Sequence, residues 1–508
     1  MLIKVFGAAV QGIDATLITI EVNSSRGCMF YLVGLPDSAV KESHQRIISA
    51  LQVNGYRMPT SNIVINMAPA DIRKEGAAYD LPLAIGILAA SEVIQSDKLE
   101  RYLLMGELSL DGSLQPTKGA LPIAIKAREL GFEGMIVPQQ NAHEAAVVNN
   151  LKVYGAGNIK EVIEFFNGTQ ELTPTLVNTR EEFYSQQSNF DFDFAEVKGQ
   201  ENVKRALEVA ASGSHNILLI GSPGSGKSML AKRLPSILPP LSLGESLETT
   251  KIHSVAGKLG KDGGLISKRP FRDPHHTIST VAMTGGGSFP QPGEISLAHN
   301  GILYLDELPE YSRNVLEVLR QPLEDRKITV SRIRCNVEYP ASFMLVASMN
   351  PCPCGYYTHP TKACVCSPGQ VQKYLNRISG PLLDRIDLQI EVTPLPFEEM
   401  ADSRPGESSA TIRERVIRAR QIQEARYADI PGIYCNAQMN SKLLARHARP
   451  DDKGLAMLKT AMNRLNLSAR AYDRILKVSR TIADLEGCEL IQPAHLAEAI
   501  GYRNLDRE

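Results

Sequence analysis

Residues 221–228 are Gly221, Ser222, Pro223, Gly224, Ser225, Gly226, Lys227 and Ser228. This run fits the pattern G-x-x-x-x-G-K-[ST] at every position, between a strand-like apolar run at 217–220 and a helix-like run at 229–234. In that order of strand, loop and helix, glycines let backbone N–H groups close around phosphate oxygens. Lys227 then reaches the terminal phosphates, and the Ser228 hydroxyl ligates Mg²⁺. The run therefore predicts a site for a nucleoside triphosphate and Mg²⁺.

A second motif, residues 301–307, ends an apolar run in the carboxylates Asp306 and Glu307. Such a run is typical of a strand that is buried in a parallel sheet. Asp306 is predicted to hold Mg²⁺ through water, and Glu307 to orient and polarise the water that attacks the γ-phosphate. The alternative is a strand that merely ends in a charged loop, but the P-loop motif upstream favours the catalytic interpretation.

The length and composition indicate an ordinary globular protein of several domains. With 508 residues, 43% of them hydrophobic and 22% charged, we expect two to four domains. The longest apolar run, residues 81–90, is too short to span a bilayer, and Gln11 and Asp14 interrupt the apolar core that a signal peptide needs. We therefore expect a cytoplasmic protein without a membrane partner. The net charge of −1 neither requires nor excludes nucleic acid as a partner.

The pattern along the chain predicts three folded regions and a linker. Alternating strand-like and helix-like runs predict an α/β domain at residues 1–166, and a polar stretch predicts a linker at 167–193. The nucleotide motifs place an ATPase-type core at 194–396, and helical periodicity with many arginines predicts a helical domain at 397–508. The elements expected in the first domain are strands at 16–22 and 63–67 and helices at 38–54 and 81–91.

The order of these parts resembles the magnesium-chelatase-like branch of the AAA+ ATPases, and the longer motifs resemble its YifB/ComM subfamily over essentially the whole chain. These motifs occupy residues 271–276, 285–287, 292–301 and 379–387. The resemblance implies an α/β fold with ATP as the nucleotide and a P-loop AAA+ core built on a parallel sheet. It also implies an N-terminal domain similar to the Lon protease domain, of the ribosomal S5 domain 2 type, and a C-terminal helical lid of the magnesium-chelatase type.

The resemblance assigns three further residues to the ATP site. Asn350 resembles sensor 1, although an Asn before Pro also commonly starts a turn. Arg385 resembles the arginine finger that reaches the nucleotide of a neighbouring subunit, and the alternative for it is a surface ion pair with Asp384 or Asp387. Arg470 resembles sensor 2, with Arg474 one helical turn away as the competing residue. A finger that acts between subunits implies a ring, which in AAA+ relatives is a hexamer.

The N-terminal domain lacks the peptidase residues of its Lon-like relatives. Judged by the flanking motifs, the position of the catalytic serine is Ala78 and that of the catalytic lysine is Leu121. Neither side chain acts as a nucleophile or base, so we expect no protease activity. A dyad assembled from Ser91 and Lys118 is the alternative. We expect this domain to bind DNA, to cap the ring or to help subunits assemble.

Four of the eight cysteines form the pattern C-x-C-x9-C-x-C directly after Asn350. They are Cys352, Cys354, Cys364 and Cys366. Four thiolates at this spacing suit tetrahedral zinc, so residues 352–366 are predicted to be a zinc-binding insert. The alternatives are small buried side chains or an oxidisable patch, and His359 is a possible substitute ligand.

Residues 327–337 predict a β-hairpin whose tip carries Arg332 and Arg334. Basic side chains there would follow phosphates with little dependence on base sequence, although a solvated basic turn explains them equally well. The insert at 273–292, with His275 and His276, is the second candidate for a moving loop. The subfamily resemblance implies a helicase or branch-migration motor on single-stranded, duplex or branched DNA, in recombination or natural transformation. The alternatives are a chelatase-like motor that remodels a protein partner and a nucleotide-dependent scaffold.

Overall fold

The computed structural model describes residues 2–95, 97–260, 263–287, 290–332, 335–357, 359–395, 405–465 and 467–503. The chain forms two compact units. The first comprises Met1–Gln186 and Leu243–Ser267, and the second comprises Gln187–Ser242 and Lys268–Glu508. Each unit has its own hydrophobic core.

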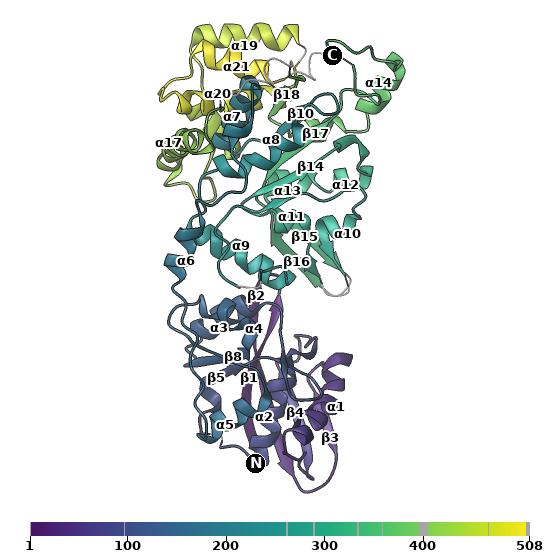
Figure 1. The fold of residues 1–508 in the computed structure, drawn as a ribbon, viewed down its shortest axis with the longest axis vertical. Helices are drawn as coiled ribbons and strands as arrows, with labels where there is room; N and C mark the ends of the chain where they lie inside the picture. The colour runs from purple at the N-terminus through teal and green to yellow at the C-terminus, as the bar shows by residue number, and fades with distance from the viewer. Residues whose placement is uncertain are drawn as a thin grey trace. The chain divides into compact units, whose positions relative to one another are not determined.

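The first unit is built on a seven-stranded mixed sheet in the order β3-β4-β2-β1-β5-β8-β9 (Figure 1). β1 and β2 form a long antiparallel hairpin, while β5, β8 and β9 extend the sheet in parallel. The strands are β1 (Leu2–Gln11), β2 (Asp14–Ser25), β3 (Phe30–Val33), β4 (Asn62–Ala68), β5 (Tyr102–Leu104), β8 (Gly134–Pro138) and β9 (Lys152–Ala156), with a small hairpin of β6 (Glu107–Leu108) and β7 (Leu114–Gln115). All four elements predicted here from the sequence are confirmed, to within two or three residues at each end.

The helix α2 (Asp80–Ala90) lies at the centre of the first unit, because every one of its residues is buried. Its nearly continuous apolar sequence is typical of a helix surrounded by protein. Gly86 allows it to pack closely on the sheet, since a Cβ there would lie 2.8 Å from Val22 Cγ2. The other helices of this unit are α1 (Ser38–Val53), α3 (Ala120–Glu129), α4 (Gln139–Ala146), α5 (Ile159–Asn167), α6 (Thr179–Gln186) and α9 (Leu243–Ala256), with the 3₁₀ turns η1 (Ala77–Tyr79) and η2 (Leu99–Arg101).

The boundaries of the first unit differ from the predicted ones in two places. Part of the expected linker forms the helix α6, which is anchored by the buried Phe183 and belongs to the compact unit. A segment from within the expected ATPase core, Leu243–Ser267, also belongs to it. Leu247 and Leu265 of that segment pack against the first core, and Ser254 donates a hydrogen bond to the buried carboxylate of Glu144. Apolar burial and this polar contact explain why the segment folds with the N-terminal region.

The second unit is built on a five-stranded parallel sheet in the order β11-β14-β17-β10-β18. Its strands are β10 (Ile217–Ile220), β11 (Phe271–Arg272), β14 (Ile302–Leu305), β17 (Met344–Met349) and β18 (Leu388–Glu391). Ile220 is paired with Met349, and Leu305 with Ala347. Because these strands are parallel and in this register, the residues that follow β10, β14 and β17 meet at one edge of the sheet. The ATP motifs lie at that edge.

Helices surround this sheet, and the C-terminal ones share its core. The yellow-green helices α17, α20 and α21 gather near α7 in Figure 1, and α17 and α20 both contact α7. The expected lid and ATPase core are therefore one compact unit with a continuous core. The helices are α7 (Glu201–Gly213), α8 (Lys227–Arg233), α10 (Thr280–Thr284), α11 (Glu294–Leu297), α12 (Arg313–Glu317), α13 (Arg320–Asp325), α14 (Pro368–Leu375), α15 (Gly380–Leu383), α17 (Ser409–Tyr427), α18 (Ser441–His447), α19 (Asp452–Arg464), α20 (Ala469–Leu485) and α21 (Pro493–Gly501).

Two hairpins and four 3₁₀ turns complete the second unit: β12 (Gly285–Gly286) with β13 (Gln291–Pro292), β15 (Lys327–Arg332) with β16 (Cys335–Pro340), and η3 (Phe194–Glu196), η4 (Leu234–Ile237), η5 (Leu308–Glu310) and η6 (Asn436–Gln438). In neither unit does a helix of the described residues combine the length and the apolar character needed to cross a membrane.

Candidate active site

The predicted phosphate loop connects β10 directly to α8. Gly224 and Gly226 have φ values of 78° and 92°, a region of backbone conformation that favours glycine. Gly221 is required for a different reason, because a Cβ there would lie 2.4 Å from the carbonyl oxygen of Val392. The glycines at these positions therefore let the loop turn tightly beside the end of β18.

Lys227 spans the loop from the first turn of α8. Its Nζ donates hydrogen bonds to the carbonyl oxygens of Gly221 (2.8 Å) and Ser222 (3.0 Å) and to Asn350 Oδ1 (3.3 Å). Burial lowers the pKa of this ammonium, while the carboxylates of Asp306 and Glu307 act in the opposite direction. The bond to Asn350 brings the predicted sensor 1 next to the predicted phosphate-binding lysine.

The predicted magnesium ligands lie together. The Ser228 hydroxyl donates to Asp306 Oδ2 at 3.0 Å. If the Ser228 hydroxyl ligates Mg²⁺, this hydrogen bond places the Asp306 carboxylate next to the ion's ligands, where it can hold the ion through water. Burial would raise the pKa of Asp306, but hydrogen bonds from Ser348 and Ser228 outweigh that effect and lower it. The carboxylate is therefore held in the charged form that binds a cation.

Sequence reasoning missed two polar residues that hold Asp306 in place. The Ser348 hydroxyl donates to Asp306 Oδ1, and the Tyr304 hydroxyl lies 3.2 Å from Ser228 Oγ. Both residues are fully buried, and both lie in the strands that end at the site. A hydroxyl inside an otherwise apolar buried strand signals that the residue has a buried partner, but it does not name that partner.

Glu307 follows Asp306 in a left-handed conformation with φ of 54°. A non-glycine residue rarely adopts this conformation, and residues in sparsely populated backbone regions tend to cluster at functional sites. The side chain is more than half exposed, and its carboxylate lies 3.9 Å from Nδ1 of His276. An exposed carboxylate at the carboxyl end of a central strand is placed to contact water above bound phosphates. His276, which was predicted to belong to a moving loop, thus lies beside the predicted catalytic base.

The predicted arginines contact acidic groups of their own chain. Arg385 is only 6% exposed and forms an ion pair with Glu324 of α13. The alternative expected for Arg385, an ion pair within the chain, is thus seen with Glu324 as the partner, while Asp384 and Asp387 pair with Arg470 and Arg474 at 3.2 Å and 3.0 Å. Arg470 itself is 63% exposed. None of the described contacts joins Arg385 or Arg470 to the phosphate loop.

Asn216, the residue before β10, fixes the segment that carries Arg385. Its backbone N–H donates to Asp387 Oδ2 and its side-chain amide to the carbonyl oxygen of Arg385, both at 2.9 Å. Asp387 is fully buried beside His215 and Arg474. Burial alone would raise the pKa of Asp387, but the charge of Arg474 and the imidazole of His215 lower it well below its usual value. The segment is therefore anchored by a buried, ionised carboxylate.

The four clustered cysteines converge. Their Sγ atoms all lie within 4.8 Å of one another, with separations of 3.3 Å for Cys352–Cys354, 3.5 Å for Cys354–Cys364 and 3.7 Å for Cys352–Cys364. Sulfur ligands of a tetrahedral zinc ion, bonded at about 2.3 Å, are about 3.8 Å apart, so the residues fit that ion. Backbone N–H groups lower the pKa of the Cys354 thiol to about 6. The Cys366 N–H alone would lower the pKa of Cys364, but burial and the neighbouring sulfurs raise it to about 12.

The cysteine cluster lies against the phosphate loop. A Cβ added at Gly355, inside the cluster, would be 2.5 Å from Pro223 Cδ. His359 is not part of the cluster, because its Nδ1 accepts hydrogen bonds from the backbone N–H groups of Thr361 and Lys362. It is therefore not needed as a substitute ligand.

A second group of metal-binding residue types has a different explanation. Glu486, Cys488 and His495 lie close together in the second unit. His495 Nδ1 accepts a hydrogen bond from the backbone N–H of Gln492, so its Nε2 carries the proton and donates to Glu486 at 2.9 Å. Since metal binding through Nε2 requires that nitrogen to be unprotonated, the arrangement is a hydrogen-bonded cap at the start of α21.

The other predicted positions are described only in part. The hairpin of β15 and β16 is confirmed, but Arg334 lies outside the described residues, and only the strand position of Arg332, paired with Cys335, is described. In the first unit, Ala78 lies in η1 and Leu121 is fully buried in α3. The Leu121 backbone N–H donates to Glu144, so that position has a structural role.

Comparison with known proteins identifies the family. Residues 193–400 match the model of the magnesium chelatase subunit ChlI, residues 20–141 match a second ChlI model, and residues 406–503 match the ChlI C-terminal model. The chain is 45% identical to the competence protein ComM of Haemophilus influenzae, over 99% of this chain and 97% of that protein. It is 43% identical to the uncharacterized protein YifB of Escherichia coli, over 98% and 96%. The chain belongs to the YifB/ComM family of magnesium-chelatase-like proteins.

More distant relatives share only part of the chain. The magnesium-chelatase 38 kDa subunit of Rhodobacter capsulatus is 26% identical over 32% of this chain and 50% of that protein. For the YifB/ComM family, the magnesium-chelatase-like AAA+ core implies an ATPase that uses ATP and Mg²⁺. The convergence of Lys227, Ser228, Asp306 and Asn350 in this structure agrees with that activity.

Proposed function

We propose that the protein is an ATP-hydrolysing ring motor that moves along DNA, acting as a helicase or branch-migration translocase in recombination or natural transformation. The observation that carries the DNA substrate is the full-length likeness to a protein named for competence. The ATPase half of the proposal is supported by the joined phosphate, magnesium and sensor residues.

In this proposal Gly221–Ser228 bind the phosphates of ATP, with Ser228 and Asp306 holding Mg²⁺. Glu307 orients the attacking water, and Asn350 fixes that water and the γ-phosphate. Arg385 reaches the nucleotide of the next protomer in a homo-hexamer, and Arg470 contacts the phosphates from within the same chain. The cysteines at 352, 354, 364 and 366 hold a structural zinc that supports the phosphate loop through Gly355 and Pro223.

The test of the DNA substrate is ATP hydrolysis by the full chain, measured across a salt series with single-stranded, duplex and branched DNA. We expect DNA to increase the rate at low salt and the increase to fade as salt rises, because phosphate contacts release counterions. An ATPase rate that no DNA changes, together with no retention of DNA by the protein, would reject the translocase.

The second candidate function is a motor that remodels a protein partner. The partial likeness to a magnesium-chelatase subunit favours it. It is separated from the first by the same assay, since it predicts ATP turnover that is indifferent to DNA and increases only with a protein partner.

A further inference from the structure

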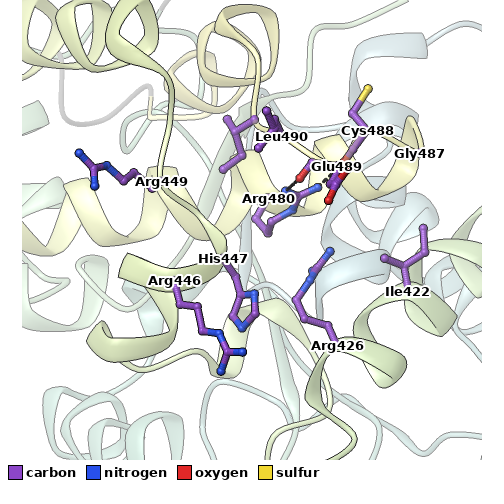
Figure 2. A pocket seen from close by; sticks show the side chains of 11 residues that line it. Ile422, Arg426, Arg446, His447, Arg449, Arg480, Gly487, Cys488, Glu489 and Leu490 are labelled. Carbon is purple, nitrogen blue, oxygen red and sulfur yellow. Dashed lines mark hydrogen bonds between the residues drawn. The ribbon is translucent and has the colours of Figure 1, made fainter.

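The C-terminal helices enclose a pocket that is separate from the nucleotide residues described above. Its volume is about 470 Å³, and side chains from α17, α18 and α20 and from the loop at 487–491 line it. Figure 2 shows the arginines of this pocket together with His447, Ile422 and Leu490. The arginines are Arg426, Arg446, Arg449 and Arg480. Four arginines at one pocket with a single acidic residue in its lining indicate an anionic ligand.

Two of these arginines form a fixed inner wall. Arg426 Nη1 donates to Asp484 Oδ2 at 2.8 Å, and Arg480 Nε donates to Asp484 Oδ1 at 3.1 Å. Arg480 is 3% exposed and also donates to the carbonyl oxygens of Cys488 and Glu489. One buried carboxylate is thus shared by two guanidinium groups, which leaves the wall with an excess of positive charge.

The other two arginines are exposed and available to a ligand. Arg446 and Arg449 make no hydrogen bond or ion pair within the described part of the chain. Glu489 is the one acidic residue among those lining the pocket. Together with the buried Asp484, the lining contains four arginines and two carboxylates. Burial, and then the charge of the surrounding arginines, lowers the pKa of His447, so its imidazole is neutral at pH 7.

The rest of the lining selects the kind of anion. Ile422 and Leu490 are exposed aliphatic side chains at the pocket, and no aromatic residue lines it. Guanidinium groups pair with phosphate oxygens in a bidentate manner. Peptides are usually anchored by a large apolar or aromatic side chain in a deep apolar well, and this pocket has no such well.

We propose that this pocket binds the phosphodiester backbone of a nucleic-acid strand, so that the C-terminal helices form a DNA contact in addition to any contact at the β15–β16 hairpin. This inference rests on the proposed function, and it assigns the strand a second binding site. Binding through phosphates is independent of base sequence, as a translocating motor requires.

The experiment compares two double variants of the full chain, using fluorescently labelled single-stranded DNA and a series of salt concentrations. Arg446→Ala/Arg449→Ala removes the two exposed pocket arginines. Lys459→Ala/Arg464→Ala is the matched control, because it removes the same charge from exposed positions on α19 that do not line the pocket. None of the four side chains has a partner in the described part of the chain, so both variants should fold.

We expect the pocket variant to bind DNA about tenfold more weakly at low salt, with basal ATPase unchanged. Its plot of log affinity against log salt should be shallower by about 1.4, the value for two lost contacts to a single strand. The control variant should match the wild type. Equal losses in both variants would overturn the inference, because they would show an effect of overall charge alone.

Two further outcomes separate this inference from the proposed function. If the wild type binds DNA and the pocket variant binds it equally well, the pocket assignment fails while the motor on DNA survives. If the wild type binds no DNA at any salt concentration, the proposed function fails and the pocket assignment fails with it. A poly-glutamate peptide serves as a third probe. Loss of peptide binding without loss of DNA binding in the pocket variant would overturn the nucleic-acid assignment in favour of an acidic protein partner.

Discussion

The residues around the phosphate loop already contact one another within a single chain, whereas the two predicted catalytic arginines contact acidic side chains elsewhere in the chain. Lys227, Ser228, Asp306 and Asn350 are already joined by hydrogen bonds at the edge of the parallel sheet. Arg385, by contrast, is paired with Glu324, and Arg470 is paired with Asp384. The nucleotide-binding residues Lys227, Ser228, Asp306 and Asn350, called the cradle below, are thus pre-organised within the chain. The positive charges that would complete the site are neutralised by acidic side chains of the same chain.

This difference has a physical cause. Strand register alone brings the ends of β10, β14 and β17 together, so the cradle needs nothing outside the chain. An arginine can leave a carboxylate only when it gains an equally strong anion, such as the phosphates of ATP in a neighbouring subunit. We therefore expect Arg385 to act only in the assembled protein and Arg470 to act only when its own chain holds ATP, and the following predictions test this contrast.

Replacing Arg385 should cause the largest loss. We expect Arg385→Ala to lower the turnover of ATP by a factor of about 10³ to 10⁵, because a finger neutralises charge that develops in the transition state. Steady-state phosphate release measures the rate, and Arg377→Ala, which removes an exposed arginine paired with Glu310, is the control. A dilute monomer that hydrolyses ATP at the wild-type rate without Arg385 would remove the finger from the mechanism.

Replacing Glu307 should cost a factor of about 10² to 10⁴ in turnover while ATP binding is retained, because the carboxylate acts on the attacking water. Glu310→Gln, in the adjoining turn, is the matched control. Mixing the Glu307→Gln and Arg385→Ala proteins sharpens the test. In a mixed ring, a site with intact Glu307 receives Arg385 from its neighbour, so activity should recover above that of either variant. No recovery would contradict a finger that acts between subunits.

Asp387→Asn should lower the free energy of unfolding by about 3 kcal/mol at pH 7, because it leaves Arg474 next to a buried site without its carboxylate. The lowered pKa of Asp387 also fixes the direction of the pH dependence. Its ionised form stabilises the folded protein above the pKa of the unfolded chain, about 4, and this stabilisation is lost as pH falls below that value. The free energy of unfolding, measured with denaturant, should therefore fall less steeply below about pH 4 in the variant than in the wild type. Asp429→Asn, at an exposed position, should behave as the wild type.

Cys364→Ser should have the smallest effect on turnover but remove the metal. We expect about one zinc per chain in the wild type and none in the variant after chelator treatment, because the tetrahedral site would lack one of its four ligands. Because Gly355 packs on Pro223, loss of zinc should loosen the phosphate loop and raise the KM for ATP more than it changes kcat. Metal analysis after chelator treatment measures the first effect, with Cys488→Ser as the control. Wild-type protein that holds no zinc and has freely titratable thiols would reject the site.

The sequence predicted the cradle well because its motifs are local. The apolar run at 217–220 and the motif at 301–307 each determine a strand end, and parallel strands bring those ends together. The pairing of Arg385 with Glu324 was not predictable in this way, since three carboxylates were available and only the tertiary structure selects one. Ser348 was missed because a single hydroxyl in an apolar strand reveals its role only when its partner is known.

The domain boundaries were the least predictable part. α6 lies in a polar stretch, and Phe183, its buried apolar residue, gives almost no periodic signal. The segment at 243–267 begins with the helix α9, and nothing in its own sequence indicates which core will accept Leu247. Which unit each segment joins depends on the surface against which it packs, and the residues of that surface lie far away in the sequence.

The excursion of Leu243–Ser267 into the first unit determines how the protein can be divided. Three connections, not one, pass between the units, after residues 186, 242 and 267. A fragment that stops at Gln186 would leave Glu144 without the hydroxyl of Ser254, and a fragment that starts at Gln187 would carry a helix stripped of its apolar support. Dividing the chain between residues 186 and 187 would therefore destabilise both fragments. The same contacts would make the two units difficult to separate during evolution.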